Sequence, residues 1–152
     1  CVNVPLPPYT TDELYLRVFE EIVIPMVERY HPDIIVTQLG VDTHYLDPLT
    51  HLCLTTRGYV AVIERMRGLA PLWLALGGGG YDISVVPRAW TLAYGIMSGQ
   101  VFPDELPPAY VEKYGPGTLR DQRGPELDPG TLAQAEDRLS VRVGDLREAF
   151  GI

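Results

Sequence analysis

The chain has 152 residues, of which 46% are hydrophobic, and its 20 acidic and 12 basic side chains give a net charge of -8. This length and this hydrophobic content are enough for one globular domain with a core, which excludes a disordered chain. The acidic balance and the lack of any Lys- or Arg-rich run argue against nucleic acid as a partner. Because no apolar run reaches about 18 residues and no secretory signal is recognisable, we expect a cytoplasmic protein with reduced cysteines and no membrane association.

The amino-terminal segments alternate helical and strand patterns. Thr10 and Glu13 have the spacing of a capping box, and the apolar residues after them predict a helix over about 12–30, bent at Pro25. The continuous apolar, β-branched run 33–40 predicts a strand that is buried on both faces.

The next segments repeat this alternation. Thr55 or Thr56 is positioned to cap a helix over about 57–67, and the apolar run 72–76 predicts a second buried strand. A third helix is expected over about 85–98. The order helix, strand, helix, strand, helix predicts an α/β fold with a parallel sheet that is flanked by helices.

Two polar or glycine-rich stretches follow the predicted strands: "GVDTHYLDPL" at 40–49 and "GGGGYD" at 77–82. In parallel sheets, ligands bind at the carboxyl ends of the strands, so these stretches are the candidates for chemistry. The glycine run predicts a tight turn with another group against its backbone, although a turn without a ligand remains an alternative. Neither the Walker loop nor the dinucleotide fingerprint is present, which disfavours nucleotide binding.

Two side chains in these stretches have alternative interpretations. Tyr81 is either a packed aromatic residue or a hydrogen-bond donor to an oxyanion. Asp42 is either a turn residue or, because His44, Asp47 and His51 lie within ten positions of it, one ligand of a metal such as zinc. From the residues alone, a hydrolytic metal site is a hypothesis.

The stretches "GVDTHYLDPLTHLCLTTRGY" (40–59) and "LALGGGGYDISVVPRAW" (74–90), with 3–36 before them, resemble the carboxyl-terminal half of zinc-dependent histone deacetylases. The resemblance is closest to the bacterial acetoin utilization deacetylases and extends over about 2–116. It implies the three-layer arginase/deacetylase-like fold with only its second half present. Residues 1–100 would form that half, and 101–152 a Pro/Gly-rich extension ending in a helix that docks on the body or makes an oligomer contact.

The resemblance also implies roles for individual residues. Asp42 matches a zinc-ligating aspartate, and Tyr81 matches the tyrosine that hydrogen-bonds the acetyl carbonyl as it becomes an oxyanion. His44 falls where the family uses no zinc ligand, so we expect it behind the site or on the surface. Four positions match the wall and rim of the acyl-lysine tunnel and would bind substrate: Gly79, Gly80, Leu49 and Pro48.

The implied function is zinc-dependent removal of acetyl groups from lysine side chains of proteins, with an acetylpolyamine amidohydrolase as the related alternative. The family's other zinc ligands, in an Asp-x-His motif, and its histidine pair lie upstream and are not in this chain. Because one protein ligand cannot make a three-ligand zinc site, we expect the chain to need the missing amino-terminal portion for activity. A non-catalytic remnant or interaction module of the same fold is the alternative from another class, and a homo-oligomer is a further expectation.

Overall fold

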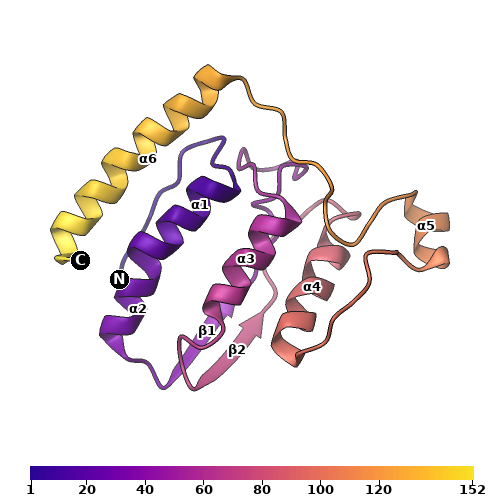
Figure 1. The fold of residues 1–152 in the computed structure, drawn as a ribbon, viewed down its shortest axis with the longest axis horizontal. Helices are drawn as coiled ribbons and strands as arrows, with labels where there is room; N and C mark the ends of the chain where they lie inside the picture. Colours follow the sequence, from indigo (N-terminus) through magenta and orange to yellow (C-terminus); the bar gives the residue numbers. More distant parts are fainter.

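In the computed structural model, which describes residues 1–152, most of the helices lie on one side of a small sheet (Figure 1). No helix is long and apolar enough to cross a membrane. The elements, in chain order, are α1 (Asp12–Val18), the π-helix η1 (Phe19–Val23), α2 (Ile24–Tyr30), β1 (Ile34–Gln38), α3 (Thr56–Met66), β2 (Leu72–Leu76), α4 (Val86–Ser98), α5 (Pro108–Tyr114) and α6 (Pro129–Phe150).

The sheet has two parallel strands, β1 and β2, paired in register from Ile34 with Leu72 to Gln38 with Leu76. The helix α3 connects them, so the predicted βαβ arrangement is confirmed. Thr55 is the N-cap of α3, because its side chain accepts a hydrogen bond from the N–H of Arg57. Because β1 and β2 run parallel, their carboxyl ends lie at the same edge of the sheet.

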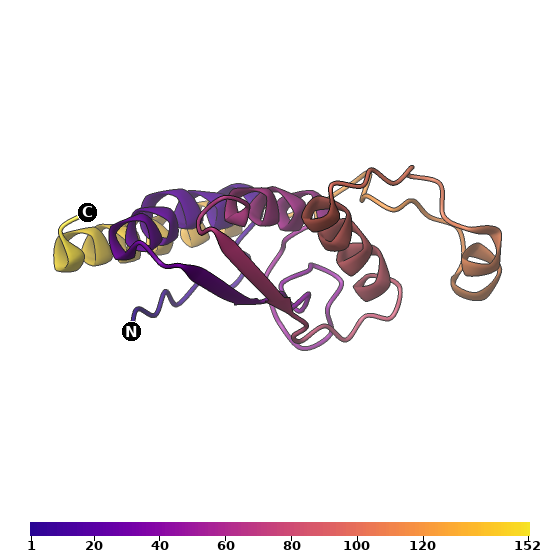
Figure 2. The same cartoon turned by 90° about the horizontal axis from the view of Figure 1, so that it is seen from below.

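One face of the sheet is uncovered in this chain. Figure 2 shows α1, α2 and α3 above the sheet and no helix below it. Side chains at alternate strand positions are exposed, among them Ile34 at 50%, Val36 at 57% and Leu72 at 61%. The expectation that both strands are buried on both faces is therefore wrong for these 152 residues, because their helices cover only one face.

Two apolar clusters hold the helices in place. The first joins the sheet to α3 and α4: Leu39, Val41, Tyr59, Ile63, Val85, Ala89 and Ala93. The second joins α1 and η1 to α6: Leu14, Val18, Ile22, Ala135, Leu139 and Val143. The helix α6 thus packs along the amino-terminal helices, as Figure 1 shows, and the predicted docking helix is confirmed.

The amino-terminal helix differs from the sequence prediction in two details. The capping box is wrong, because the hydroxyl of Thr10 donates to the carbonyl of Pro7 at 2.7 Å and the helix begins after Thr11. The segment 12–30 is helical throughout, but it passes through the π-helical turn η1 just before Pro25. Proline has no N–H for the regular hydrogen-bond ladder, so an irregular turn beside it is expected.

Candidate active site

The loop after β1 and the glycine run after β2 lie against each other. The N–H of Leu39 donates to the carbonyl of Leu76 at 2.9 Å, and the N–H of Val41 donates to the carbonyl of Gly79 at 2.6 Å. These bonds extend the pairing of the strands beyond the sheet. Residues 39–42 and 76–79 are consequently held side by side.

The carboxylate of Asp42 occupies the space that side chains at two glycines would take. A Cβ atom at Gly79 would overlap this carboxylate, and one at Gly40 would lie 2.9 Å from Asp42 Oδ1. Gly80 has φ of +140°, which side chains rarely allow, and a Cβ there would lie 2.9 Å from the side chain of Val86. Contacts within this chain therefore account for glycine at these positions.

Asp47 links the loop after β1 to Tyr81. Its carboxylate is buried and accepts hydrogen bonds from the N–H of Leu49 and the N–H of Tyr81, each at 2.9 Å. The bond to Leu49 is the local turn that an Asp before Pro48 favours. The bond to Tyr81 spans 34 positions, so no local pattern in the sequence predicts it.

Three of the predicted substrate-binding or catalytic side chains are open to solvent. Tyr81 is 55% exposed, Leu49 is 64% exposed, and Pro48 is exposed. This exposure does not fit the interpretation of Tyr81 as a packed core aromatic. The roles of Leu49 and Pro48 in a substrate tunnel stay predictions.

Of the four clustered Asp and His residues, Asp42 places its carboxylate against Gly79, and Asp47 bonds to the N–H of Tyr81 just after the glycine run. His44 is buried and bonds to Asp121, and His51 is exposed. No group of three or more His, Cys, Asp or Glu side chains in this chain is placed to hold a metal ion. Asp42 is half-buried. A carboxylate at a strand end fits one position of a zinc site that has three protein ligands.

A second tyrosine lies beside Asp42. Burial, and then the negative charge of Asp42, raise the pKa of Tyr15 above its ordinary value. With Gly40 and Thr43, this tyrosine lines a small cavity of about 50 Å³ behind the loop. Tyr15 therefore stays protonated next to the candidate ligand, a neighbour that the sequence analysis did not identify.

His44 is not on the surface, because only 3% of it is exposed, and its Nε2 lies 2.8 Å from a carboxylate oxygen of Asp121. Burial by itself would raise the pKa of Asp121. Hydrogen bonds from His44, Thr56 and Arg88 outweigh this effect and hold the pKa of Asp121 well below its usual range. The Pro/Gly-rich extension is thus anchored in the body at Asp121.

The sequence of residues 1–97 matches the family described as histone deacetylase domain. The chain belongs to the histone deacetylase family. The acetoin utilization protein AcuC of Staphylococcus xylosus is 41% identical over 122 residues, which cover 76% of this chain and 32% of that protein. AcuC of Bacillus subtilis is 38% identical over 118 residues, covering 74% of this chain and 30% of that protein.

Solved structures agree with this membership of the histone deacetylase family. The structure of an HDAC homolog complexed with SAHA has a TM-score of 0.76 and 26% identity, and the match covers 93% of this chain and 42% of that chain. An HDAC homolog from Aquifex aeolicus has the same TM-score at 25% identity, with the same coverage. The predicted deacetylase fold is thereby confirmed, and the chain spans about a third of the length of the curated AcuC relatives.

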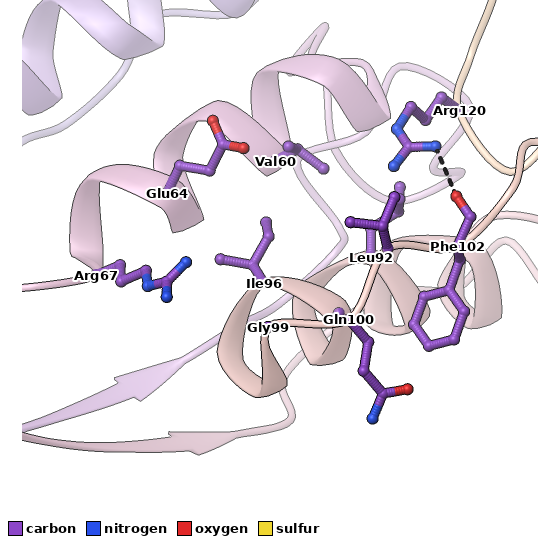
Figure 3. A pocket seen from close by; sticks show the side chains of 11 residues that line it. Val60, Glu64, Arg67, Leu92, Ile96, Gly99, Gln100, Phe102 and Arg120 are labelled. Carbon is purple, nitrogen blue, oxygen red and sulfur yellow. Dashed lines mark hydrogen bonds between the residues drawn. The ribbon is translucent and has the colours of Figure 1, made fainter.

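A groove elsewhere on this histone deacetylase family chain contains none of the predicted site residues. It encloses about 270 Å³ and lies between α3 and α4, with Glu64 and Arg67 at one side and Ile96 at the other (Figure 3). In the same figure, Arg120 donates to the carbonyl of Phe102 at 3.4 Å. This bond joins two positions within the extension 101–152.

Proposed function

We propose that this chain is the carboxyl-terminal part of a zinc-dependent deacetylase that removes acetyl groups from lysine side chains of proteins. The observation that supports this most strongly is the contact between the carboxylate of Asp42 and the backbone of Gly79, two residues before Tyr81. It brings the predicted zinc ligand and the predicted oxyanion donor onto adjoining strand ends, where parallel α/β sheets bind ligands.

In this proposal, Asp42 holds zinc together with ligands from the missing amino-terminal portion. A zinc ion held there would supply Lewis acidity to the acetyl carbonyl and would lower the pKa of a water molecule, whose proton would pass to a histidine of the missing portion. Tyr81 donates a hydrogen bond from its phenol to the acetyl oxygen as that oxygen gains negative charge. The bare backbone of Gly79 and Gly80 forms part of the wall of the acyl-lysine tunnel, and Leu49 and Pro48 border the path of the lysine stem.

The uncovered face of the sheet supports the need for a further portion. Five large apolar side chains on that face are between 46% and 61% exposed: Ile34, Val36, Leu72, Leu74 and Leu76. Apolar patches of this kind mark interaction surfaces. We propose that the missing amino-terminal portion covers them and that the isolated chain is inactive.

The test is a fusion of residues 1–152 to the amino-terminal part of the Staphylococcus xylosus AcuC. We expect the fusion to bind zinc and to release acetate from an acetyl-lysine peptide, whereas the 152-residue chain alone does not. Asp42→Asn should abolish zinc binding. Tyr81→Phe should keep zinc but lower kcat by about 100-fold to 1,000-fold, the typical cost of removing an oxyanion donor.

Two matched variants serve as controls. Asp33→Asn changes an exposed carboxylate just before β1, and Tyr94→Phe removes an exposed phenol from α4. Both should retain zinc and turnover. If the fusion with Asp42→Asn binds zinc as tightly as the parent, the ligand assignment is wrong. Full turnover by Tyr81→Phe would refute the oxyanion role.

A further inference from the structure

A buried carboxylate from the tail collects hydrogen bonds from three parts of the body. Asp121 exposes 9% of its side chain. Its Oδ2 lies 2.8 Å from His44 Nε2 and accepts the N–H of Thr56 at 2.8 Å, while its Oδ1 accepts Arg88 Nη1 at 2.9 Å. The N–H of Asp121 donates back to Thr56 Oγ1 at 2.7 Å. One side chain thus joins the loop after β1, the start of α3 and the first half of α4.

The bonds of His44 fix its tautomer. The N–H of Leu46 donates to His44 Nδ1 at 3.2 Å, so this nitrogen carries no proton. Nε2 therefore carries the proton and donates it to Asp121. The imidazole acts as a rigid bridge between the tail and the turn that follows Asp42.

That turn is held at both ends by the groups of the candidate active site. The N–H of His44 donates to the carbonyl of Val41 at 3.1 Å, and the N–H of Asp47 donates to the carbonyl of His44 at 2.9 Å. Val41 precedes Asp42, and Asp47 accepts the N–H of Tyr81. A shift of His44 would consequently move the supports of both predicted catalytic groups.

We propose that Asp121 is a positioning residue of the deacetylase site, acting through His44 to fix the turn that carries Asp42 and Asp47. The proposal rests on the proposed function of Asp42 and Tyr81. It gives Asp121, which follows the 1–97 match to the histone deacetylase domain, a role in the geometry of the site. A carboxylate suits this position because the three groups that bond to it are all donors: the Nε2–H of His44, the backbone N–H of Thr56 and the guanidinium of Arg88.

Asp121→Asn tests the proposal, because the NH2 group of the asparagine would replace one accepting oxygen and would face the hydrogen-bond donors that this oxygen now binds. Leu139→Ala is the matched control: it removes a fully buried side chain from the α6 cluster and touches neither His44 nor Asp121. Amide hydrogen exchange of the 152-residue chain is the first measurement. We expect Asp121→Asn to speed exchange at Leu46, Leu49 and Tyr81 about tenfold, and Leu139→Ala to speed it in α6 instead.

A pair of variants at His44 keeps the test decisive if Asp121→Asn does not fold. The amide group of a glutamine side chain lies about where histidine has its Nε2 atom. The amide group of an asparagine side chain lies about where histidine has its Nδ1 atom. His44→Gln should therefore keep the bridge to Asp121 and protect the amide of Tyr81, whereas His44→Asn should lose that protection. Equal protection of the Tyr81 amide against exchange in both His44 variants would overturn the proposal. The same pattern of amide exchange in Asp121→Asn as in Leu139→Ala would also overturn it.

Activity gives a second, separate measurement in the AcuC fusion. We expect Asp121→Asn to weaken zinc binding about tenfold and to lower kcat about tenfold with KM unchanged, a size typical of groups that orient metal ligands. Leu139→Ala should change neither constant. An inactive parent fusion would refute the proposed function while the exchange data still decide the role of Asp121. Normal zinc binding and kcat in Asp121→Asn would refute that role alone.

Discussion

The carboxylate of Asp47 accepts a hydrogen bond from the backbone N–H of Tyr81 at 2.9 Å. Tyr81 is more than half exposed, so its own side chain has few contacts to set its position. The backbone bond supplies a fixed base for the exposed phenol. Asp47 thereby connects the loop of the predicted zinc ligand to the predicted oxyanion donor.

Asp47→Asn should weaken both stability and turnover. The amide can accept from only one of the two N–H groups, so one buried donor is left unmatched at a cost of about 1 to 3 kcal/mol in the free energy of unfolding. Urea unfolding measures this loss. In the AcuC fusion, zinc binding should persist while kcat falls. Asp104→Asn, in an exposed ion pair with Arg120, is the control and should leave kcat unchanged.

Gly79→Ala should remove zinc binding from the fusion. The added methyl group would overlap the carboxylate of Asp42, which must then leave its position. Gly144→Ala adds the same methyl group in α6, where nothing lies within 4 Å of it, and should stabilise that helix by about 1 kcal/mol. Zinc titration of the two variants distinguishes them. Equal zinc affinity in both would contradict the placement of Asp42 at the metal.

Local patterns predicted the elements that position the site. The apolar runs 33–40 and 72–76 and the cap at Thr55 sufficed for the βαβ unit, because each depends on neighbouring residues. Because the carboxyl ends of parallel strands lie at one edge of a sheet, the sequence also predicted that Asp42 and the glycine run lie close together. The uncovered sheet face could not be predicted, because an apolar run indicates that side chains are to be buried, not which segment buries them.

Contacts over long distances in the sequence were missed. Asp121 lies 77 positions from His44, in a segment whose Pro, Gly and charged residues are typical of a loop. Nothing near Asp121 marks it as a buried acceptor. At Thr10 the local pattern was present but the nearby carbonyl of Pro7 took its hydroxyl, so the capping box did not form.

Asp12→Ala should destabilise the fold at the start of α3. The two oxygens of Asp12 accept the N–H and the hydroxyl of Thr55, each at 2.7 Å, so α1 holds the N-cap of the crossover helix. Losing both bonds should lower the free energy of unfolding by about 1 to 3 kcal/mol. Urea unfolding checks this. Glu13→Ala removes an exposed carboxylate next along the helix and should change the stability by less than about 0.5 kcal/mol.

Acidification should remove the stabilisation supplied by Asp121. In the folded chain, His44, Arg88 and the N–H of Thr56 lower the pKa of the Asp121 carboxyl. In the unfolded chain, this pKa lies near the reference value of about 3.9. Above the unfolded pKa, Asp121 is ionised in both states, so its full stabilisation of the fold is present. Below the unfolded pKa, the unfolded chain binds a proton at Asp121 before the folded chain does, so the free energy of unfolding falls as the pH is lowered.

The comparison of wild type with Asp121→Asn isolates this carboxyl, because the other acidic groups titrate in both proteins. At neutral pH the variant should be less stable by about 3 to 5 kcal/mol, since Arg88 loses its buried partner. The difference should shrink as the pH is lowered below about 4, the reference pKa. Urea midpoints between neutral pH and pH of about 2.5 measure it. A difference that stays constant over this range would mean that the charge of Asp121 contributes nothing to the fold.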